Sequence, residues 1–414
     1  MSEKLNVVFI GCGRFCRSFV PLFKAHPAVA SVGLCDLIRD RAEEFSKTFQ
    51  VEKIYDSFED VLKDSKVNAV AIFTQRHLHA PLVKKALRAG KHVYSAVPTA
   101  TTVEDIQEIE QIVRETRLIY ATGETGAYRP CTIFCREKMR SGEFRNFVYG
   151  EAQYDHDMRH FYDSYKYSGG ENWRQVAGFP PMLYPTHSTS MILSCLPGVY
   201  AKKVSAFGYT EKHDTDIFGK NGVNLWNNPF SNTTALLHLS NDGIVRLSEN
   251  RRIGWYSPQS YISNFHTETG SYEFAVAHHY FCTWDPADPK KVILKEVSDQ
   301  LNPPEIQAHI NEADMIGQIG NGIGFRMTAP IQPLERLPKE LHGLPNGHNG
   351  THHFMTDDFC KGVSENKLPP TNIWQAARFN LPGIIANESA QRDGETMDVP
   401  DLGEPPADWE VMQF

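Results

Sequence analysis

The sequence lacks any long apolar run and any block of basic residues. None of its apolar runs approaches the roughly 20 residues that a helix needs to span a bilayer, so we expect no membrane partner. Its 42 lysine and arginine residues are outnumbered by 50 aspartate and glutamate residues, which argues against nucleic acid as a partner. The first expected strand begins at Leu5, which leaves no room for a signal peptide, and we expect a cytoplasmic protein.

The cysteines and histidines show no pattern typical of a metal site. The eight cysteines are scattered, and several lie in apolar segments, as expected of reduced thiols in a cytosolic protein. Cys131 and Cys135 lie one helical turn apart, but no second pair accompanies them, so we expect no zinc site there. A later cluster is interpreted as loop and helix-start residues instead of metal ligands; it consists of His348, His352, His353, Asp357 and Asp358.

A glycine-rich turn follows the first apolar run. The motif Gly11–Gly13 comes directly after Leu5–Ile10, and the helix-like segment Arg14–Lys24 follows it. The first glycine allows a tight turn, and the second lets the backbone approach a pyrophosphate at the helix N-terminus. Cys16 stands where the fingerprint has its third glycine and is small enough for close packing. The pattern predicts a dinucleotide site; the alternative is an ordinary turn that uses glycine for its positive φ.

An acidic residue, Asp36, closes the next apolar run. A carboxylate at this strand end accepts hydrogen bonds from the adenosine ribose hydroxyls and repels a 2′-phosphate. Leu37 and Ile38 offer no cation, although Arg39 lies within reach. We therefore predict NAD in preference to NADP as the cofactor.

Apolar strands alternate with amphipathic helices over residues 1–124. This alternation predicts a doubly wound parallel sheet of the Rossmann type, with the ligand at the carboxyl ends of its strands. The expected strands are Leu5–Ile10, Ser31–Asp36, Val67–Thr74, His92–Val97 and Leu118–Glu124, and the expected helices include Leu78–Ala89 and Val103–Glu115.

A second domain is expected over residues 125–414. A helix-like segment, Tyr128–Arg140, leads into long alternating runs that predict an open mixed or antiparallel sheet in an α+β domain. These runs include Phe147–Tyr154, Thr233–Leu239 and Gly243–Glu249. Residues 285–350 are rich in proline, glycine and asparagine, and we expect them to form long surface excursions.

Several segments together resemble the Gfo/Idh/MocA family of NAD(P)-dependent sugar enzymes. They are Thr74–Ala80, Ala89–Val93, Gly347–His352 and Pro382–Ile384. The resemblance implies a Rossmann domain followed by an open-faced sheet domain, assembled as a homodimer or homotetramer, and a small carbohydrate or glycoside as substrate. With the turn described above, it implies a cofactor site made of Gly11, Cys12, Gly13, Arg14, Phe15, Asp36, Thr74, Gln75, His77, His79, Val97 and Pro98.

One position departs from the dehydrogenases of that family. Most of them carry Glu-Lys-Pro after the Gly-Lys-His-Val strand, and the lysine assists proton transfer at the reacting hydroxyl. Here Val97 precedes Pro98, and valine cannot move a proton. A Val-Pro pair at this point is similar to the NAD-dependent glycosidase branch typified by α-N-acetylgalactosaminidases.

Three further segments match that glycosidase branch in order. Glu124 and Tyr128 follow the last Rossmann strand, Tyr154–Arg159 matches Tyr-x-His-Asp-x-Arg, and Tyr184–His187 matches Tyr-Pro-Thr-His. After that histidine the familiar members continue with Gly-Leu-Gly, whereas this chain has Ser188–Ser190. Because this difference lies where substrate is gripped, the identity of the sugar does not carry over.

The resemblance implies a redox-neutral hydrolysis that differs from the usual paired-carboxylate scheme. The sugar is transiently oxidised at C3, loses its C2 proton, eliminates the aglycone, adds water and is reduced again. We expect His187 to take the C3 proton and Tyr154 the C2 proton, although the two roles can be exchanged. Glu124 is expected to act with them as a third catalytic residue that binds or polarises hydroxyls near the nicotinamide. The residues expected to hold the substrate are Tyr128, Asp157, Arg159 and Tyr184.

Other interpretations of these residues stay open. Tyr154 fits ordinary strand packing, and His187 fits a helix-start residue bonded to a loop. Asp157 and Arg159 fit a simple ion pair. Arg251 and Arg252 fit either a solvated pair at a strand end or a site for an anionic substituent of the sugar.

Two other functions also stay open. One is a net sugar dehydrogenase in which His187 replaces the missing lysine. The other is a nucleotide-binding protein without catalysis, which the presence of several acid–base residues argues against.

Overall fold

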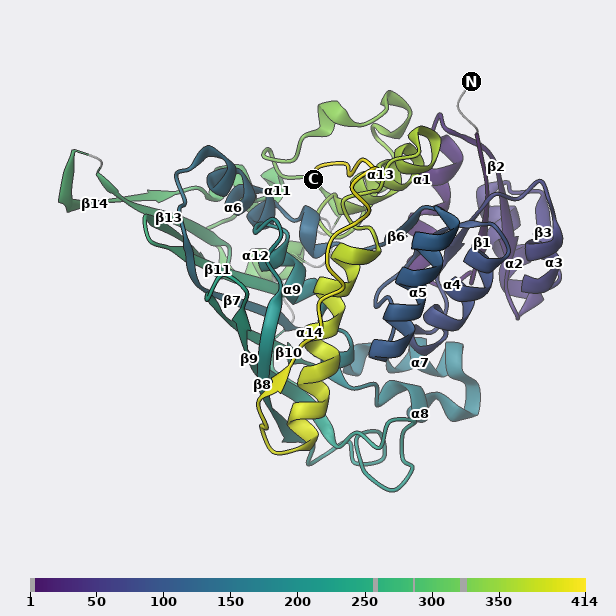
Figure 1. Cartoon of the computed structure of the whole chain (residues 1–414), viewed down its shortest axis with the longest axis horizontal. Helices are drawn as coiled ribbons and strands as arrows, with labels where there is room; N and C mark the ends of the chain where they lie inside the picture. Colours follow the sequence, from purple (N-terminus) through teal and green to yellow (C-terminus); the bar gives the residue numbers. More distant parts are fainter. Residues whose placement is uncertain (1–3, 256–259, 286, 321–325) are drawn as a thin grey trace. The chain divides into compact units, whose positions relative to one another are not determined.

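The structure is a computed structural model that describes residues 4–255, 260–285, 287–320 and 326–414 (Figure 1). Contacts between residues divide the chain into two compact units. Unit 1 comprises Met1–Tyr128, Pro333–Ala377 and Leu402–Phe414, and unit 2 comprises Arg129–Gln332 and Arg378–Asp401. The expected division into a domain of residues 1–124 and a domain of residues 125–414 stays a prediction. By contacts, two later segments join the N-terminal part.

Unit 1 is built on a six-stranded parallel sheet with the order β3-β2-β1-β4-β5-β6. This is the doubly wound order predicted from the sequence, with the reversal of strand order between β1 and β4. Strand β3 was not expected, because three residues are too few to form a recognisable pattern. The strands are β1 (Leu5–Ile10), β2 (Val29–Cys35), β3 (Lys53–Tyr55), β4 (Ala69–Ile72), β5 (His92–Ser95) and β6 (Tyr120–Thr122).

Two helices of unit 1, α3 and α5, begin at side-chain caps. Ser57 accepts a hydrogen bond from the Asp60 N–H, and Thr102 accepts one from the Asp105 N–H, so each satisfies a donor of a first helical turn. The helix expected over Arg14–Lys24 is instead a 3₁₀ turn, Phe15–Ser18, followed by a short helix. The α-helices are α1 (Val20–Ala25), α2 (Arg39–Phe49), α3 (Phe58–Lys63), α4 (His79–Arg88), α5 (Val103–Thr116) and α13 (Thr351–Glu365).

Unit 2 is built on a nine-stranded sheet with the order β14-β13-β12-β11-β7-β10-β9-β8-β15. Neighbouring strands are antiparallel except β7 and β10, which run parallel. The predicted mixed sheet is therefore confirmed. The strands are β7 (Phe147–Asp155), β8 (Ala201–Thr210), β9 (Phe230–Leu239), β10 (Ile244–Asn250), β11 (Tyr261–Thr267), β12 (Gly270–Ala275), β13 (His278–Asp285), β14 (Asp288–Glu296) and β15 (Met397–Asp398).

Helices cover one face of that sheet, and α9 lies against β7, β10 and β11. The sheet strands show the corresponding alternation: Ala152 and Tyr154 of β7 are buried, while Glu151 and Gln153 are half-buried. The helices are α6 (Pro130–Ser141), α7 (Tyr162–Gly169), α8 (Trp173–Ala177), α9 (Thr186–Leu193), α10 (Ser298–Leu301), α11 (Pro304–Gln307), α12 (Ala313–Gly320) and α14 (Ile373–Gln391), which begins in unit 1 and continues in unit 2.

The surface excursions expected over residues 285–350 are only partly present. Strand β14 and helices α10, α11 and α12 lie within this stretch, so the expectation of irregular structure is wrong for its first part. A proline and several lysines interrupt the pattern of β14, whose residues Val292–Glu296 pair with β13. Residues 286 and 321–325 of this stretch lie outside the described part of the chain. Over the described residues, no helix combines the length and apolar character required to cross a bilayer.

Candidate active site

The glycine turn of unit 1 has the geometry that the fingerprint requires. Gly11 has a φ of +95°, and a Cβ atom there would lie 2.8 Å from the carbonyl oxygen of Phe73. Only glycine fits this position without strain. A Cβ atom at Gly13, in contrast, would meet no atom within 4 Å, so space is open beside the backbone there. Cys16 is fully buried and packs where the third glycine of the motif stands.

Asp36 is tied to the glycine turn through its carboxylate. Its Oδ2 accepts a hydrogen bond from the Cys12 N–H at 2.7 Å, and its Oδ1 accepts one from the Ile38 N–H at 2.8 Å. Each oxygen has a second lone pair, so the carboxylate keeps acceptor capacity for ribose hydroxyls. Arg39, which the sequence places within reach of this strand end, pairs with Glu43 and Asp56.

The loops that follow β4 and β5 supply the other predicted cofactor residues. The Thr74 hydroxyl is buried and has no hydrogen-bond partner among the described residues. His79 is buried, with Nδ1 2.8 Å from the Pro98 oxygen and Nε2 3.1 Å from the Thr74 oxygen, so its ring joins the two loops. Both ring nitrogens of His79 thus face backbone oxygens of these loops, and its part in binding the cofactor stays a prediction. Val97 is buried beside Pro98.

The remaining predicted cofactor residues are more accessible. Arg14 is exposed, and Gln75 and His77 are half-buried. Burial lowers the pKa of His77. The Phe15 ring is also exposed, and its edge faces the imidazoles of His348 and His352 at centroid distances of 5.6 and 5.5 Å.

These residues fit a dinucleotide. The open space at Gly13 leaves room for a pyrophosphate, and the unpartnered Thr74 hydroxyl offers a buried donor and acceptor at the end of β4. Both lie at the carboxyl ends of the strands that flank the switch point of the sheet, where ligands of open α/β sheets bind. Asp36 would hold the ribose, and the backbone after Gly11 would hold the phosphates.

Glu124 and Tyr128 lie near the end of the last strand of unit 1. Glu124 is fully buried, and its Oε1 accepts a hydrogen bond from the Gly126 N–H at 2.5 Å. The Tyr128 hydroxyl donates to Asp358 Oδ2 at 2.7 Å. Asp358 also accepts from Arg336 at 2.8 Å. The Tyr128 hydroxyl is thus part of a buried network within unit 1, and its role in substrate binding stays a prediction.

In unit 2 the structure brings three of the predicted residues into one aromatic cluster. His187 lies in the first turn of α9, with its ring edge-on to Tyr154 at a centroid distance of 5.2 Å and to Tyr184 at 5.0 Å. Tyr154 comes from β7, and its ring is 6.3 Å from that of Tyr184. His187 and Tyr154 are both buried. Two groups able to transfer protons therefore lie side by side on adjacent elements.

Three further residues complete the cluster, and sequence reasoning did not select them. Tyr261 of β11 stacks on Tyr154 at 4.8 Å, and its ring lies 4.9 Å from His187. His156 Nδ1 lies 3.0 Å from the Tyr154 hydroxyl. The Arg129 guanidinium lies 4.3 Å from the centre of the Tyr261 ring. Tyr261 pairs directly with Tyr154 across two strands, a register that the sequence does not reveal.

The protonation of Tyr154 is set by burial and by a nearby cation. Burial raises the pKa of Tyr154 to about 12. The Arg251 guanidinium lies 4.5 Å from the centre of its ring and opposes that rise, because a cation favours the phenolate. The Tyr154 phenolate is therefore a strong base, and the ease with which the phenol ionises depends on nearby charges such as that of Arg251.

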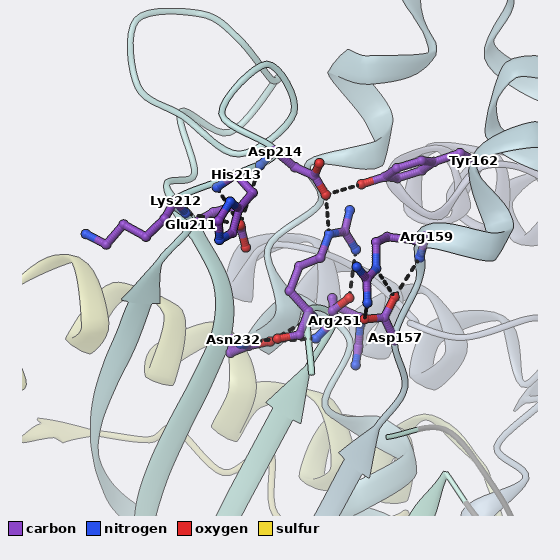
Figure 2. Close-up of polar contacts among 10 residues, drawn as sticks. Asp157, Arg159, Tyr162, Glu211, Lys212, His213, Asp214, Asn232 and Arg251 are labelled. Atoms are coloured by element: carbon purple, nitrogen blue, oxygen red, sulfur yellow. Dashed lines mark hydrogen bonds and ion pairs between the residues drawn. The ribbon is translucent and has the colours of Figure 1, made fainter. Parts of the chain in front are cut away.

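Asp157 and Arg159 form the ion pair that the sequence left open. Arg159 donates through Nε to Asp157 Oδ1 at 2.9 Å and through Nη2 to Oδ2 at 2.8 Å (Figure 2). Burial raises the pKa of Asp157, but the hydrogen bonds from Arg159 outweigh this effect and lower it. The Arg159 side chain is 65% exposed, so its charge also faces solvent.

The interpretation of Arg251 and Arg252 as a solvated pair is wrong. Their backbone N–H groups both donate to Asn232 Oδ1 at 2.9 Å, and each side chain turns into unit 2 toward a carboxylate. Arg251 pairs with Glu249 at 2.8 Å. Arg252 pairs with Asp214. Asp214 also accepts a hydrogen bond from the Tyr162 hydroxyl (Figure 2). A buried guanidinium requires a carboxylate partner of this kind. The sequence pattern does not reveal these partners, because it does not show which carboxylates lie close to the two arginines in the fold.

The histidines and aspartates at and before α13 have separate partners. His348 bonds to His352, His353 to the Leu341 oxygen, Asp357 to His26 and Lys361, and Asp358 to Arg336. Over the described ranges of the chain, no three His, Cys, Asp or Glu residues are grouped in a way that could hold a metal ion.

Residues 5–124 match the Gfo/Idh/MocA family, described as an oxidoreductase family with an NAD-binding Rossmann fold. The chain carries a Gfo/Idh/MocA domain. The resemblance predicted from the sequence, the Rossmann fold and the choice of NAD are thereby confirmed, and the protein is an NAD-dependent enzyme.

The Gfo/Idh/MocA domain and the sheet unit together have full-length relatives. The chain is 23% identical to a glycosyl hydrolase family 109 protein of Saccharopolyspora erythraea, over 97% of this chain and 83% of that protein. It is 22% identical to another of Streptomyces filamentosus, over 96% of this chain and 77% of that protein. Its fold is similar to that of levoglucosan dehydrogenase in complex with NADH and levoglucosan, with a TM-score of 0.71, 18% identity, and coverage of 96% and 100%. At that identity the structural likeness shows the fold alone.

Proposed function

We propose that this enzyme hydrolyses a glycoside without net redox change. The observation that carries the proposal is the gathering of Tyr154, His187 and Tyr184 into one aromatic cluster, in which Tyr154 and His187 are buried. A net dehydrogenase needs one proton-transfer group at the reacting hydroxyl, whereas elimination after oxidation needs a second base for the C2 hydrogen. The relatives named glycosyl hydrolase family 109 proteins and the Val97–Pro98 pair support the same proposal.

The residues of unit 2 supply the proton transfers. When bound, NAD⁺ supplies the capacity to accept a hydride from C3 of the sugar and to return it. His187 takes the proton of the C3 hydroxyl, and Tyr154 takes the C2 proton, which the neighbouring C3 ketone has made acidic. The aglycone then leaves C1 with the bonding electrons and takes up a proton, equivalent to the one removed from C2, and an unsaturated ketone remains. Addition of water across that double bond and restoration of C3 complete the hydrolysis.

Other residues of the chain bind the sugar in this proposal. Glu124 accepts hydrogen bonds from sugar hydroxyls, as a buried carboxylate able to hold several donors. Tyr184 orients the ring through its half-buried face. Asp157 and Arg159 present a pre-formed ion pair, of which Arg159 is the exposed partner. Tyr128, whose hydroxyl donates to Asp358, is a further substrate-binding residue in this proposal.

We further propose that the enzyme is a cytoplasmic homodimer or homotetramer. The face of the unit 2 sheet opposite the helices carries exposed apolar side chains on adjacent strands, among them Phe207 at 61% and Leu236 at 54% exposure. Apolar patches on adjacent strands of this kind are typical of contacts between protein chains. A second copy of the chain is the occupant that a closed, symmetric assembly would place there.

The decisive experiment combines product analysis with a cofactor assay. Purified protein is incubated with a panel of nitrophenyl glycosides in both anomeric forms, and the released sugar and the NADH absorbance are followed together. Release of nitrophenol and free sugar without accumulation of NADH supports the proposal. NADH formed in step with an oxidised glycoside whose bond is intact assigns the enzyme as a dehydrogenase and contradicts the proposal.

A further inference from the structure

A buried ion pair lies beside the aromatic cluster of unit 2. Glu249 and Arg251 are two residues apart at the end of β10, so their side chains leave the same side of the chain. Their side chains are 0% and 5% exposed, and Arg251 Nη2 lies 2.8 Å from Glu249 Oε2. Burying two charges often costs as much as their attraction returns. The pair is therefore a poor source of stability, and its contacts suggest another role.

The pair contacts the elements that carry both proposed proton-transfer groups. Arg251 Nη1 donates to the Tyr154 carbonyl oxygen at 3.3 Å, and the guanidinium lies over the Tyr154 ring at 4.5 Å. Glu249 Oε1 accepts a hydrogen bond from the hydroxyl of Ser188, the residue that follows His187 in α9. One network of side chains thus joins β10 to β7 and to the first turn of α9.

We propose that Ser188, Glu249 and Arg251 form a positioning network that holds Tyr154 and His187 in the geometry for proton transfer and sets the charge around the Tyr154 phenol. The inference rests on the proposed function, because it takes Tyr154 and His187 as the proton-transfer groups. Ser188 stands where the resembled glycosidases continue with glycine, so the hydroxyl that closes the network is a feature of this chain.

The two charges of the pair act on Tyr154 in opposite directions. The Arg251 cation lowers the pKa of the phenol, and the Glu249 carboxylate raises it by a smaller amount. Burial raises the pKa of Glu249 itself to about 8, so its charge is present above that pH. The other titratable groups that face Tyr154 are His156 on its own strand, Tyr261 from β11, His187 and Tyr184 at α9, Tyr165 from α7 and Arg129 before α6.

Two substitutions in the pair are therefore expected to shift the pKa of the Tyr154 phenol in opposite directions. Glu249→Gln leaves the cation uncompensated, so the phenol ionises more easily. The double variant Glu249→Gln with Arg251→Met removes the cation as well, so burial dominates and the phenol ionises less easily. A network with only a structural role would lower activity in both variants without moving the pH dependence.

Rate–pH profiles of the NAD-loaded enzyme test this prediction, with the nitrophenyl glycoside that the wild type hydrolyses fastest as the probe. A base that acts deprotonated gives a kcat that rises with pH through its apparent pKa. We expect Glu249→Gln to move this rise to lower pH and the double variant to move it to higher pH, each by about half a pH unit or more, or roughly threefold in rate on the rising limb. KM is expected to stay within about threefold of the wild type.

A third variant and a matched control separate positioning from charge. Ser188→Ala cuts only the link to α9, and we expect kcat to fall about tenfold with KM retained and with the rise of kcat left at the same pH, as for the loss of one buried hydrogen bond that positions a catalytic group. Glu151→Gln is the control, because Glu151 pairs with Arg246 across the same two strands on the other face of the sheet. Its profile should match that of the wild type.

The proposed network is overturned if the rate–pH profiles of Glu249→Gln and of the double variant move in the same direction. It is also overturned if neither profile moves in folded, NAD-loaded protein. If the double variant does not fold, Arg251→Lys replaces it. The positive charge remains in that variant, so kcat should fall while its rise with pH stays at the same pH, and a displaced rise contradicts the inference.

If the wild type cleaves no glycoside, the proposed function fails. The network is then tested without substrate by tyrosinate absorbance after a rapid pH jump, measured with and without Tyr154→Phe. Easier ionisation in Glu249→Gln supports the network, and unchanged ionisation overturns it.

Discussion

The imidazole of His187 meets the ring of Tyr154 edge-on, with centroids 5.2 Å apart and ring planes at 84°. The two residues are 33 positions apart in sequence and come from a helix and a strand that pack together. Their contact places two groups able to transfer protons side by side in unit 2. This arrangement is what a reaction with two separate proton transfers requires.

Substitution of either residue is therefore expected to reduce turnover sharply. His187→Ala and Tyr154→Phe should each lower kcat on the order of a hundredfold or more, the usual range for a lost acid–base group. NAD content and the thermal unfolding midpoint should stay near those of the wild type. Steady-state kinetics on NAD-loaded protein give the measurement. Tyr149→Phe, on the other face of the same strand, is the matched control, and equal activity in all of these variants would show that the cluster only packs.

The sequence predicts this cluster in part, for a physical reason. Tyr154, Tyr184 and His187 lie in short motifs whose order along the chain is visible without a structure. Tyr261 is not visible, because its place beside Tyr154 follows from the register between β7 and β11, and sequence periodicity does not determine register. Glu249 and Arg251 share a strand face by their spacing, but a surface pair would have the same spacing, so burial decides their role.

The fold of unit 1 is more predictable than that of unit 2. Its expected strands differ from the observed ones by a few residues, because fully buried parallel strands form continuous apolar runs. Residues 333–377 and 402–414 join unit 1 through long-range packing, which leaves no local signal. The strand Asp288–Glu296 was missed because a proline and several lysines interrupt its pattern.

Gly11 and Gly13 are expected to respond differently to the same substitution. Gly11→Ala places a Cβ atom 2.8 Å from the Phe73 oxygen at a φ of +95°, so we expect a loss of stability of about 1–3 kcal/mol, as for other strained backbone positions. Gly13→Ala meets no protein atom within 4 Å, so stability should be retained while the added methyl group occupies the space expected for the pyrophosphate. Denaturant unfolding and NAD titration distinguish the two; normal NAD affinity in Gly13→Ala would contradict the placement of the phosphates.

Asp36 is expected to contribute to NAD affinity through its charge. Asp36→Ala removes the acceptor for ribose hydroxyls and the bond to the Cys12 N–H, and we expect the Kd for NAD to rise on the order of tenfold or more. Asp40→Ala, an exposed carboxylate in the first turn of α2, is the control and should bind normally. Isothermal titration of cofactor-free protein measures both. An unchanged Kd in Asp36→Ala would remove the reason for preferring NAD over NADP.

The exposed face of the unit 2 sheet is expected to hold copies of the chain together. Leu236→Glu introduces a buried charge into such a contact, so light scattering should show a smaller species than the wild type. Leu225→Glu, an equally exposed apolar residue outside the sheet, should leave the mass unchanged. A wild type that is monomeric at micromolar concentration would contradict the assembly.

Solvent isotope exchange is expected to separate hydrolysis by elimination from net oxidation. If Tyr154 removes the C2 proton while C3 is a ketone, and water later returns a proton to C2, then hydrolysis in D₂O should place deuterium at C2 of the released sugar. NADH should not accumulate in proportion to product, because in a redox-neutral cycle the hydride taken from C3 is returned to C3 before the sugar is released. A substrate deuterated at C3 should also react more slowly if hydride transfer limits the rate even in part. Mass spectrometry and NMR of the sugar locate the label.

Tyr154→Phe should lose C2 exchange and hydrolysis together, since both need the same base. Protium alone at C2, together with stoichiometric NADH, would assign Tyr154 to packing and give His187 the role of the missing lysine.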